Sequence, residues 1–340
     1  MSLPPSEIPL GAIRFNSDSQ KLEYWNGEAW FQVKTFSPTL EGGARGVFSG
    51  GDPSRDTNMD YITIATRGNG TDFGDFPISN GTGNRGIIGS NTRGFCNGGE
   101  SPSAGDSHNV IGKWEFTSTG SAIDFANLTF TSKGGPGLSN ATRAVQARGY
   151  GAPSITHEDV CFFTMASQQD AVDFGDLISG SSYGGSGIAS PTRGVIITAR
   201  SASVNFVNNI EYVTIATTGS FADFGDVTNI DNSDFTATAG NSTRGVLAGG
   251  QDSPNTQTEI SYVTYATTGN TIKFGDLHTA NSYAAAVSDS ITMITGGGQG
   301  ATNRMDAINI ATGGTSVDSG DLTVSKTTMT GSSNGHGGLG

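Results

Sequence analysis

Charged residues, cysteines and long apolar runs are all scarce in this chain. Charged residues make up 14% of the 340 residues, against about 25% in an average soluble protein. No run of 18 apolar residues occurs, which excludes a membrane-spanning helix. Residues 1–10 contain no basic stretch followed by an apolar one, so no secretory signal is expected. The two cysteines, Cys96 and Cys161, match neither a metal-binding spacing nor a disulfide framework, and we expect both to be buried free thiols.

The charge is strongly acidic, with 18 basic and 31 acidic residues and a net charge of −13. A negative surface repels the phosphate backbone of nucleic acids and the headgroups of anionic lipids. We therefore expect no nucleic-acid partner and no membrane insertion.

Glycine is abundant, at 51 residues, and it recurs within sequence signatures that repeat at intervals of about 50 residues. An aromatic-Gly-Asp signature occurs at Asp72–Asp75, Asp173–Asp176, Asp223–Asp226 and Lys273–Asp276, with degenerate copies at Asp124–Asn127 and Asp318–Asp321. An arginine signature runs in phase with it at Ala44–Val47, Thr92–Phe95, Thr142–Val145, Thr192–Val195 and Thr243–Val246. A third signature occurs at Tyr61–Thr66, Tyr212–Thr217 and Tyr262–Thr267. Six copies account for nearly the whole chain.

Each repeat has the pattern of four short strands. In the fifth repeat the expected strands are Asp234–Ala239, Arg244–Ala248, Glu259–Ala266 and Thr271–Phe274, separated by clusters of Gly, Asn, Ser and Thr. No segment shows helical periodicity over three turns. Six such units bury both faces of their sheets when they stack radially. The sequence therefore predicts an all-β fold in which residues 37–340 form a six-bladed β-propeller of four-stranded blades.

A ring of blades also has to close, and no innermost strand precedes Arg45–Ser49 in the first repeat. At the other end of the chain, Thr327–Asn334 is similar to the first strands of other repeats, such as Ser282–Ser288. We therefore predict that the C-terminal strand Thr327–Asn334 pairs with Arg45–Ser49, because this pairing removes two open sheet edges.

The repeats resemble those of a known family. The sixth repeat, with a diglycine at the end of its second strand in Ile291–Gly298, resembles a kelch repeat. The motifs Thr-Arg-Gly-Val, Tyr-Val-Thr-Ile-Ala-Thr-Thr-Gly and Asp-Phe-Gly-Asp, together with Ser333–Leu339, resemble kelch-like structural proteins of tailed bacteriophages, particularly marine cyanophage-type virion and tail proteins. The resemblance covers residues 37–340. Repeats three and four depart from it, with Arg148 and Ala199-Arg200 where the diglycine is expected.

This resemblance implies a non-enzymatic protein of the virion, assembled in the cytoplasm of the bacterial host and present in multiple copies. Its partners would be other virion proteins of the tail or capsid. The leading interpretation is a propeller displayed on the tail or fibre apparatus that contacts the host surface. Two alternatives stay open, namely a capsid decoration protein without receptor binding and a free lectin-like adhesion propeller.

Residues 1–36 lie outside the repeats and have the pattern of short strands, with Asn26-Gly27 predicting a type I′ hairpin. The segment resembles a small module at the start of many phage tail and virion proteins. Because aromatic residues dominate interface energetics, we expect a docking segment that binds another virion protein through Trp25, Trp30, Tyr24 and Phe15. The alternative is a flap that packs on the propeller.

Residues that could suggest an enzyme occur once per repeat at equivalent positions. We expect the arginines of the second signature to pair with the aspartates Asp75, Asp176, Asp226 and Asp276, and aspartates such as Asp72 to cap turns. A catalytic site breaks such symmetry, so no catalytic residue is predicted. The four histidines, His108, His157, His278 and His336, share no metal-ligand spacing and are expected as lone loop residues. Neither a metal nor a cofactor is predicted.

The connections on one face of the predicted disc are long and differ between repeats, and binding residues concentrate on loops of this kind. Tyr150, His157, Tyr183 and Phe206 lie in or near the long connections of repeats three and four. They are the candidate recognition residues, and the ligand that we expect for them is a glycan or a protein of the host surface.

Overall fold

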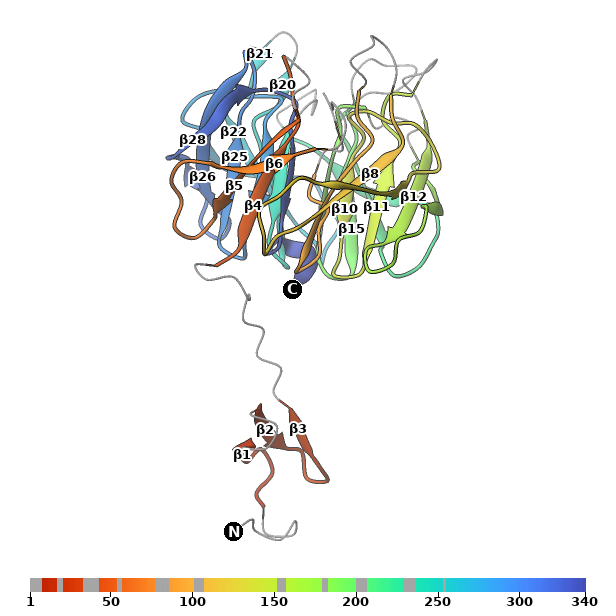
Figure 1. Ribbon diagram of the computed structural model, residues 1–340, viewed down its shortest axis with the longest axis vertical. Coiled ribbons are helices and arrows are strands. Elements are labelled where there is room, and N and C mark those ends of the chain that lie inside the picture. Colours follow the sequence, from red (N-terminus) through yellow and green to blue (C-terminus); the bar gives the residue numbers. More distant parts are fainter. Residues whose placement is uncertain are drawn as a thin grey trace. The chain divides into compact units, whose positions relative to one another are not determined.

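The structure is a computed structural model, and it describes residues 8–16, 21–32, 43–53, 57–76, 83, 86–100, 107–151, 157–178, 183–199, 207–228, 236–252 and 255–340 (Figure 1). The chain divides into two compact units, Met1–Thr39 and Leu40–Gly340. Both consist of β-strands, and the helical element in the described ranges is one 3-10 turn, η2 (Gly337–Leu339). The expected all-β class is confirmed.

The smaller unit is a three-stranded antiparallel sheet of β1 (Ile13–Asn16), β2 (Lys21–Trp25) and β3 (Trp30–Gln32). The hairpin between β2 and β3 is present, but its turn differs from the expected type I′ turn. Trp25 pairs with Trp30, so four residues form the loop. The side-chain oxygen of Asn26 accepts hydrogen bonds from the main-chain nitrogens of Glu28 and Ala29, which stabilises this longer loop.

The larger unit contains six sheets of three to five strands within the described residues, and we name them A to F. Sheet A comprises β29 (Thr330–Ser333), β4 (Arg45–Ser49), β5 (Asn58–Thr63) and β6 (Thr71–Asp75). Sheet B comprises β7 (Arg93–Asn97), β8 (Val110–Glu115) and β9 (Ile123–Asn127). Sheet C comprises β10 (Gly137–Ser139), β11 (Arg143–Ala147), β12 (Asp159–Thr164) and β13 (Val172–Asp176).

The remaining three sheets follow the same pattern. Sheet D comprises β14 (Ser186–Ala189), β15 (Arg193–Ile197), β16 (Asn209–Thr214) and β17 (Ala222–Asp226). Sheet E comprises β18 (Ala237–Gly240), β19 (Arg244–Ala248), β22 (Glu259–Thr264), β23 (Ile272–Asp276) and the parallel β27 (Gly314–Thr315). Sheet F comprises β24 (Ala285–Ser288), β25 (Thr292–Gly296), β26 (Thr302–Asn309) and β28 (Val317–Lys326). A short hairpin of β20 (Gln251–Asp252) and β21 (Asn255–Thr256) extends from sheet E.

The predicted pairing of the two ends of the larger unit is confirmed. Strand β29 pairs antiparallel with β4, with Thr330 opposite Ser49 and Ser333 opposite Gly46. The side-chain oxygen of Asn334 also accepts a hydrogen bond of 2.7 Å from the main-chain nitrogen of Arg45. The C-terminal strand therefore supplies the first strand of sheet A.

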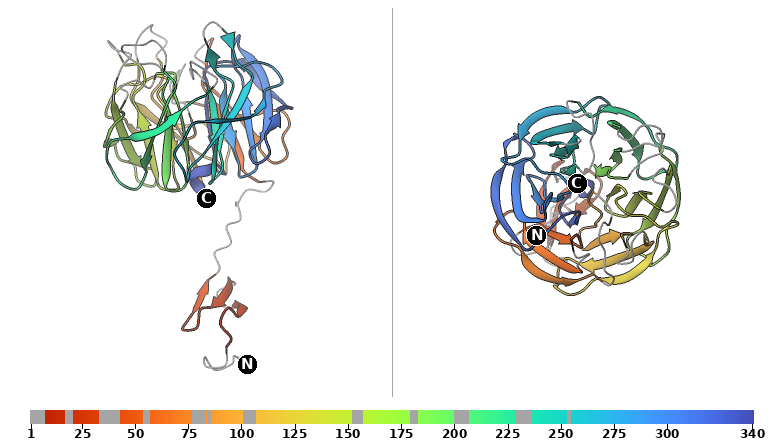
Figure 2. Two further views of the ribbon diagram at one scale, coloured as in Figure 1. Left: turned by 180° about the vertical axis from the view of Figure 1, so that it is seen from behind. Right: turned by 90° about the horizontal axis from the view of Figure 1, so that it is seen from above.

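Main-chain hydrogen bonds join each sheet to the next in sequence. The outer strand of one sheet accepts a bond from a turn of its neighbour: Gly120 N to Phe73 O (A to B), Ala171 N to Asn127 O (B to C), Gly219 N to Phe174 O (C to D), Gly269 N to Phe224 O (D to E), Ser316 N to Asp276 O (E to F) and Gly68 N to Ser319 O (F to A), at 2.7 to 3.0 Å. The series begins and ends at sheet A. Figure 2 shows the sheets side by side around the C-terminal residues.

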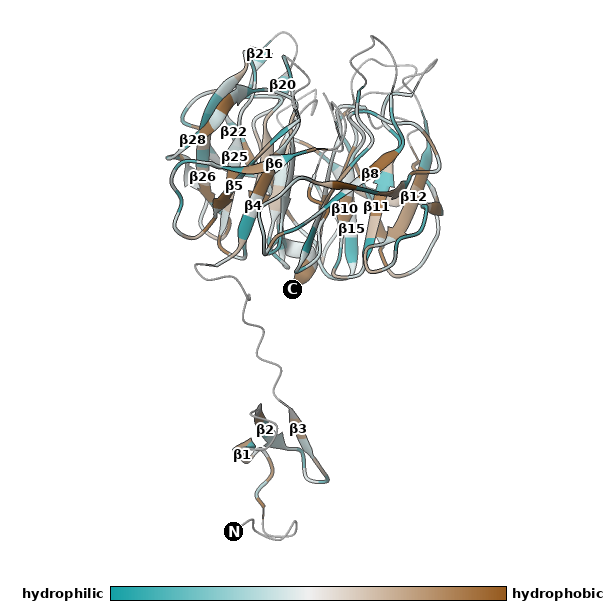
Figure 3. Cartoon of the chain, in the orientation of Figure 1, coloured by the Kyte–Doolittle hydropathy of each residue, from teal (hydrophilic) through white to brown (hydrophobic). Residues whose placement is uncertain are grey.

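The hydrophobic core lies between neighbouring sheets. One cluster contains Ile188 and Phe224 of sheet D with Leu247 and Val263 of sheet E, all at most 4% exposed. Figure 3 shows that hydrophobic residues lie on the strands of the larger unit. The inner strands carry smaller side chains, and their hydroxyls bond sideways to the next sheet, as Ser288 Oγ does to the carbonyl of Gly240 at 2.8 Å. Both cysteines are buried free thiols, as predicted, and burial raises the pKa of Cys161 to about 12.

Candidate functional site

The repeated arginines contact main-chain carbonyls of the next sheet. Arg143 Nη1 donates to the carbonyl oxygen of Ile215 at 2.9 Å, and Arg244 Nη1 donates to that of Ile310 at 2.9 Å. Arg45, Arg93 and Arg193 make the equivalent bonds to Phe116, Met165 and Tyr265. The expected pairing with the repeated aspartates is therefore wrong. A carbonyl is present at every residue, so a sequence pattern gives no sign of this partner.

Aromatic rings complete the arginine contacts. The guanidinium carbon of Arg244 lies 4.0 Å from the centre of the Tyr262 ring, and that of Arg143 lies 4.2 Å from the Phe162 ring. The aspartates have local roles instead. Asp72 accepts a hydrogen bond from the main-chain nitrogen of Gly74 at 3.2 Å. The expected bond to a nearby main-chain N–H is present, but Asp72 lies in strand β6 and not in a turn. These contacts give the repeated charges a structural role.

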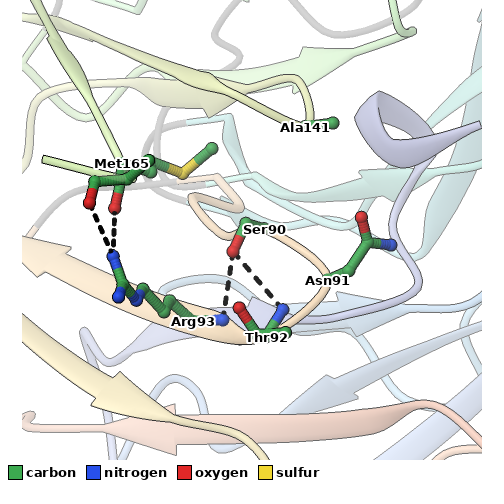
Figure 4. A pocket seen from close by; sticks show the side chains of 7 residues that line it. Ser90, Asn91, Thr92, Arg93, Ala141 and Met165 are labelled. Atoms are coloured by element: carbon green, nitrogen blue, oxygen red, sulfur yellow. Dashed lines mark hydrogen bonds between the residues drawn. The ribbon is translucent and has the colours of Figure 1, made fainter. Parts of the chain in front are cut away.

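A pocket of about 380 Å³ lies between sheets B and C (Figure 4). Several of its polar groups bond to one another: Arg93 Nη1 donates to the carbonyls of Met165 and Ala166, and Ser90 Oγ accepts from the main-chain nitrogen of Arg93. Asn91 Nδ2 in the lining is buried without a hydrogen-bond partner among the described residues. Asn140 and Asn241 accept the equivalent turn bonds from Arg143 and Arg244. Because the same contacts recur in other sheets, we assign this pocket to the architecture of the repeats.

His336 is a residue whose position the sequence did not indicate. We expected a lone loop residue, but the side chain is 4% exposed. Its Nε2 lies 2.9 Å from the carbonyl oxygen of Gly89 in the segment before β7, and 3.4 Å from Ser139 Oγ at the end of β10. The similarity to the strands of other repeats ends at Asn334, so repeat analysis gives residues 335–340 no expected position.

The four proposed docking residues lie on opposite faces of the small N-terminal sheet. Residues directly opposite one another in neighbouring strands share a face, so Phe15 and Tyr24 lie with Ile13, Leu22 and Phe31. All five are exposed, from 40% for Leu22 to 66% for Ile13. We call these five residues the apolar face.

Trp25 and Trp30 belong to the other face, with Arg14 and Glu23. The two indole rings are 5.5 Å apart, the Arg14 guanidinium lies 4.2 Å from the Trp30 ring, and Arg14 pairs with Glu23 at 2.8 Å. Hydrogen bonds from Asn16 and Arg14 lower the pKa of Glu23. Trp25 is only 6% exposed, so it belongs to the packing of the unit itself. Alternation of apolar and polar residues along β1 was the signal that separates the faces.

Three of the four candidate recognition residues come close together in the larger unit, and Phe206 lies outside the described residues. The rings of Tyr150 and Tyr183 are 6.1 Å apart at 62°. His157 Nε2 donates to the carbonyl oxygen of Gly151 at 3.0 Å. Lys133 contacts the Tyr150 ring and forms an ion pair with Glu100. The sequence pointed to neither of these two residues.

Within the described ranges, no helix is long and apolar enough to cross a membrane, and no cluster of three or more His, Cys, Asp or Glu side chains is arranged to hold a metal ion. No protein-family model and no curated protein sequence matches the chain.

Proposed function

We propose that the larger unit is a six-bladed, kelch-like β-propeller and that the chain is a non-enzymatic structural protein of a tailed-phage virion. The series of hydrogen bonds from sheet A through sheets B to F and back to A carries the fold proposal. Radial stacking of this kind leaves only short, protected sheet edges. The virion assignment rests on the resemblance of the repeats to phage proteins and on a separate N-terminal unit with an exposed apolar surface.

The N-terminal unit is proposed to attach the propeller to another virion protein of the tail or fibre apparatus. Its apolar face is the docking surface, because contiguous exposed apolar patches on small units mark protein interfaces. Phe15 and Tyr24 remain docking residues in this proposal. Trp25 and Trp30 pack against each other on the opposite face of the sheet.

The attachment is tested with phage that carry F15S and Y24S together. Loss of a buried aromatic anchor costs about 2 kcal/mol or more, so we expect the double variant to be missing from purified particles. Native fluorescence of Trp25 and Trp30 checks that the small sheet is folded. The matched control is I291S, which removes a 61% exposed side chain from the larger unit and should leave incorporation unchanged. Normal incorporation of a folded double variant would overturn the docking surface.

The location on the particle is tested by immunogold labelling of intact virions with an antibody against the larger unit. Label on the tail or fibres is expected, since that position lets the long loops reach the host surface. Label on the capsid would replace this assignment with a decoration role. Complete absence of the protein from purified particles would overturn the virion assignment.

A further inference from the structure

The segment before β10 packs through glycine against the residues that follow β11. The main chains of Lys133 and Tyr150 exchange both hydrogen bonds, each of 2.9 Å. A Cβ on Gly149 would lie 2.2 Å from the carbonyl oxygen of Lys133, and one on Gly135 would lie 2.3 Å from that of Ala147. This approach is possible only for glycine, and it fixes the direction in which Tyr150 leaves the chain.

The ring of Tyr150 packs against a lysine whose charge is neutralised by an ion pair. The Lys133 ammonium lies 4.7 Å from the centre of the Tyr150 ring and 2.8 Å from a carboxylate oxygen of Glu100. The side chains of Lys133 and Glu100 are only 14% and 15% exposed. Beside them, Arg148 pairs with Asp159 at 3.2 Å. The rings of Tyr150 and Tyr183 therefore pack on each other beside two ion pairs, and neither cation of these pairs is unpaired.

Equivalent positions elsewhere in the ring use polar contacts. Glu100, Tyr150 and Gln251 follow β7, β11 and β19 by three residues, and each contacts a residue just before the first strand of the next sheet. The contact is the ion pair with Lys133 between sheets B and C, and a hydrogen bond of 2.8 Å from the Tyr283 hydroxyl to Gln251 between sheets E and F. The Tyr150–Tyr183 pair is therefore chemically unlike the two other contacts, and its two aromatic rings distinguish this position.

We infer that Tyr150 and Tyr183 form a binding site for a neutral hexose unit of a glycan. The two rings meet at 62°, and both tyrosines are partly exposed. A tyrosine ring suits the apolar C–H face of a pyranose, and its hydroxyl can bond the sugar hydroxyls. Asp159 is 53% exposed and His157 is held beside it by Gly151, and both supply further polar groups. Lys133 and Arg148 already pair with carboxylates, so neither is left as an unpaired cation that would favour an acidic sugar. This inference specifies the ligand of the host contact proposed above and rests on it.

The test uses the full-length protein and an array of immobilised oligosaccharides. The probes end in glucose, galactose or mannose, and sialylated and sulfated glycans are included for comparison. We expect binding to at least one neutral probe, and a fall in affinity of about ten-fold or more for Y150A and for Y183A, the equivalent of about 1.4 kcal/mol. Y150F retains the ring and should retain most of the affinity.

The matched control is Y283A, because Tyr283 occupies the equivalent inter-sheet contact in another part of the ring. Its affinity for the neutral probes should equal that of the wild type. Y183L keeps an apolar side chain of similar size, so it tests the aromatic ring if Y183A fails to fold. Absence of binding to every neutral probe, binding to acidic probes only, or equal losses for Y150A and Y283A would each overturn the site. Incorporation of the protein into particles is measured separately, so failure here is distinct from failure of the virion assignment.

Discussion

His336 Nε2 donates a hydrogen bond of 2.9 Å to the carbonyl oxygen of Gly89, a residue 247 positions earlier in the chain. The carbonyl can only accept, so the proton is on Nε2, and Nδ1 accepts from the main-chain nitrogen of Gly338 at 3.2 Å. Next to it, a Cβ on Gly337 would lie within 2.6 Å of carbonyl oxygens of Ala189 and Asn241. The C-terminal residues thus contact sheets B, C, D and E through one neutral histidine and its neighbours.

This arrangement predicts an acid-sensitive stability. Burial lowers the pKa of His336 from 6.5 to about 4. Between these values the unfolded chain binds a proton that the folded chain does not, so stability falls as the pH drops from about 6.5 toward 4. The contribution of His336 that is lost is about 3 kcal/mol. Denaturant unfolding at several pH values measures it.

H336Q and H278Q provide the comparison. Glutamine at position 336 has no titration in this range, so the H336Q protein should lose less stability between pH 6.5 and 4 than the wild type does. His278 bonds to Thr279 at the exposed surface, and H278Q should follow the wild-type pH dependence. If the three proteins show parallel pH profiles, His336 is not the titrating group.

Truncations at the two ends of the chain should differ in their effect on the stability of the larger unit. Removing residues 327–340 deletes β29 and His336, so β4 loses its partner and the inner contacts of several sheets are lost. An exposed sheet edge promotes association, and we expect aggregation or a much lower melting temperature. Removing residues 1–39 deletes the separate unit and should leave the melting of the larger unit unchanged. A monomeric 1–326 protein with wild-type melting would contradict the role of β29.

The strands could be predicted because they depend on local patterns, and the end pairing because the first repeat lacks a first strand that the C-terminal residues supply. The second strand of the fifth repeat, Arg244–Ala248, was predicted with its observed bounds. Partners across sheets were harder to predict. Arginines and aspartates recur with one period, and such a pattern cannot distinguish a carboxylate partner from a carbonyl of the next sheet. Likewise, Trp25 and Phe15 are both aromatic, and the strand register places them on opposite faces of the small sheet, of which that of Phe15 is exposed.

The arginine contacts lead to a prediction that opposes the pairing expected from the sequence. R244M removes hydrogen bonds to the carbonyls of Ile310 and Ala311 and the stack on Tyr262, and should lower the free energy of unfolding by about 2 to 3 kcal/mol. D276N changes an aspartate with a half-exposed side chain, which pairs with Lys273 and accepts a hydrogen bond from Thr258, and should change the free energy of unfolding by less than about 1 kcal/mol. Chemical denaturation measures both. Equal losses of stability for R244M and D276N would favour an interaction between Arg244 and Asp276 and contradict this prediction.

Two glycines face each other at five of the six junctions between sheets, the exception being the junction of sheets B and C with Ala126. The junction of sheets D and E allows a controlled test. Gly225 and Gly269 both have a positive φ, of 144° and 151°, so alanine strains the backbone at either position by about 1 to 3 kcal/mol. A Cβ on Gly225 would also lie 2.6 Å from the carbonyl carbon and oxygen of Gly269, whereas a Cβ on Gly269 would meet no atom within 4 Å. The difference between the two variants therefore isolates the close contact between the sheets.

We expect G225A to be less stable than G269A by about 2 to 3 kcal/mol, because the added methyl group has to push the turn of sheet E away and weaken the bond of 2.7 Å from Gly269 N to Phe224 O. Hydrogen exchange at the amide of Gly269 reports this bond directly. Its protection should fall in G225A and persist at the neighbouring junction, where Gly219 N bonds to Phe174 O. Equal stabilities of the two variants would mean that the sheets can separate at this junction without cost, and the ring of hydrogen bonds would then not hold the larger unit together.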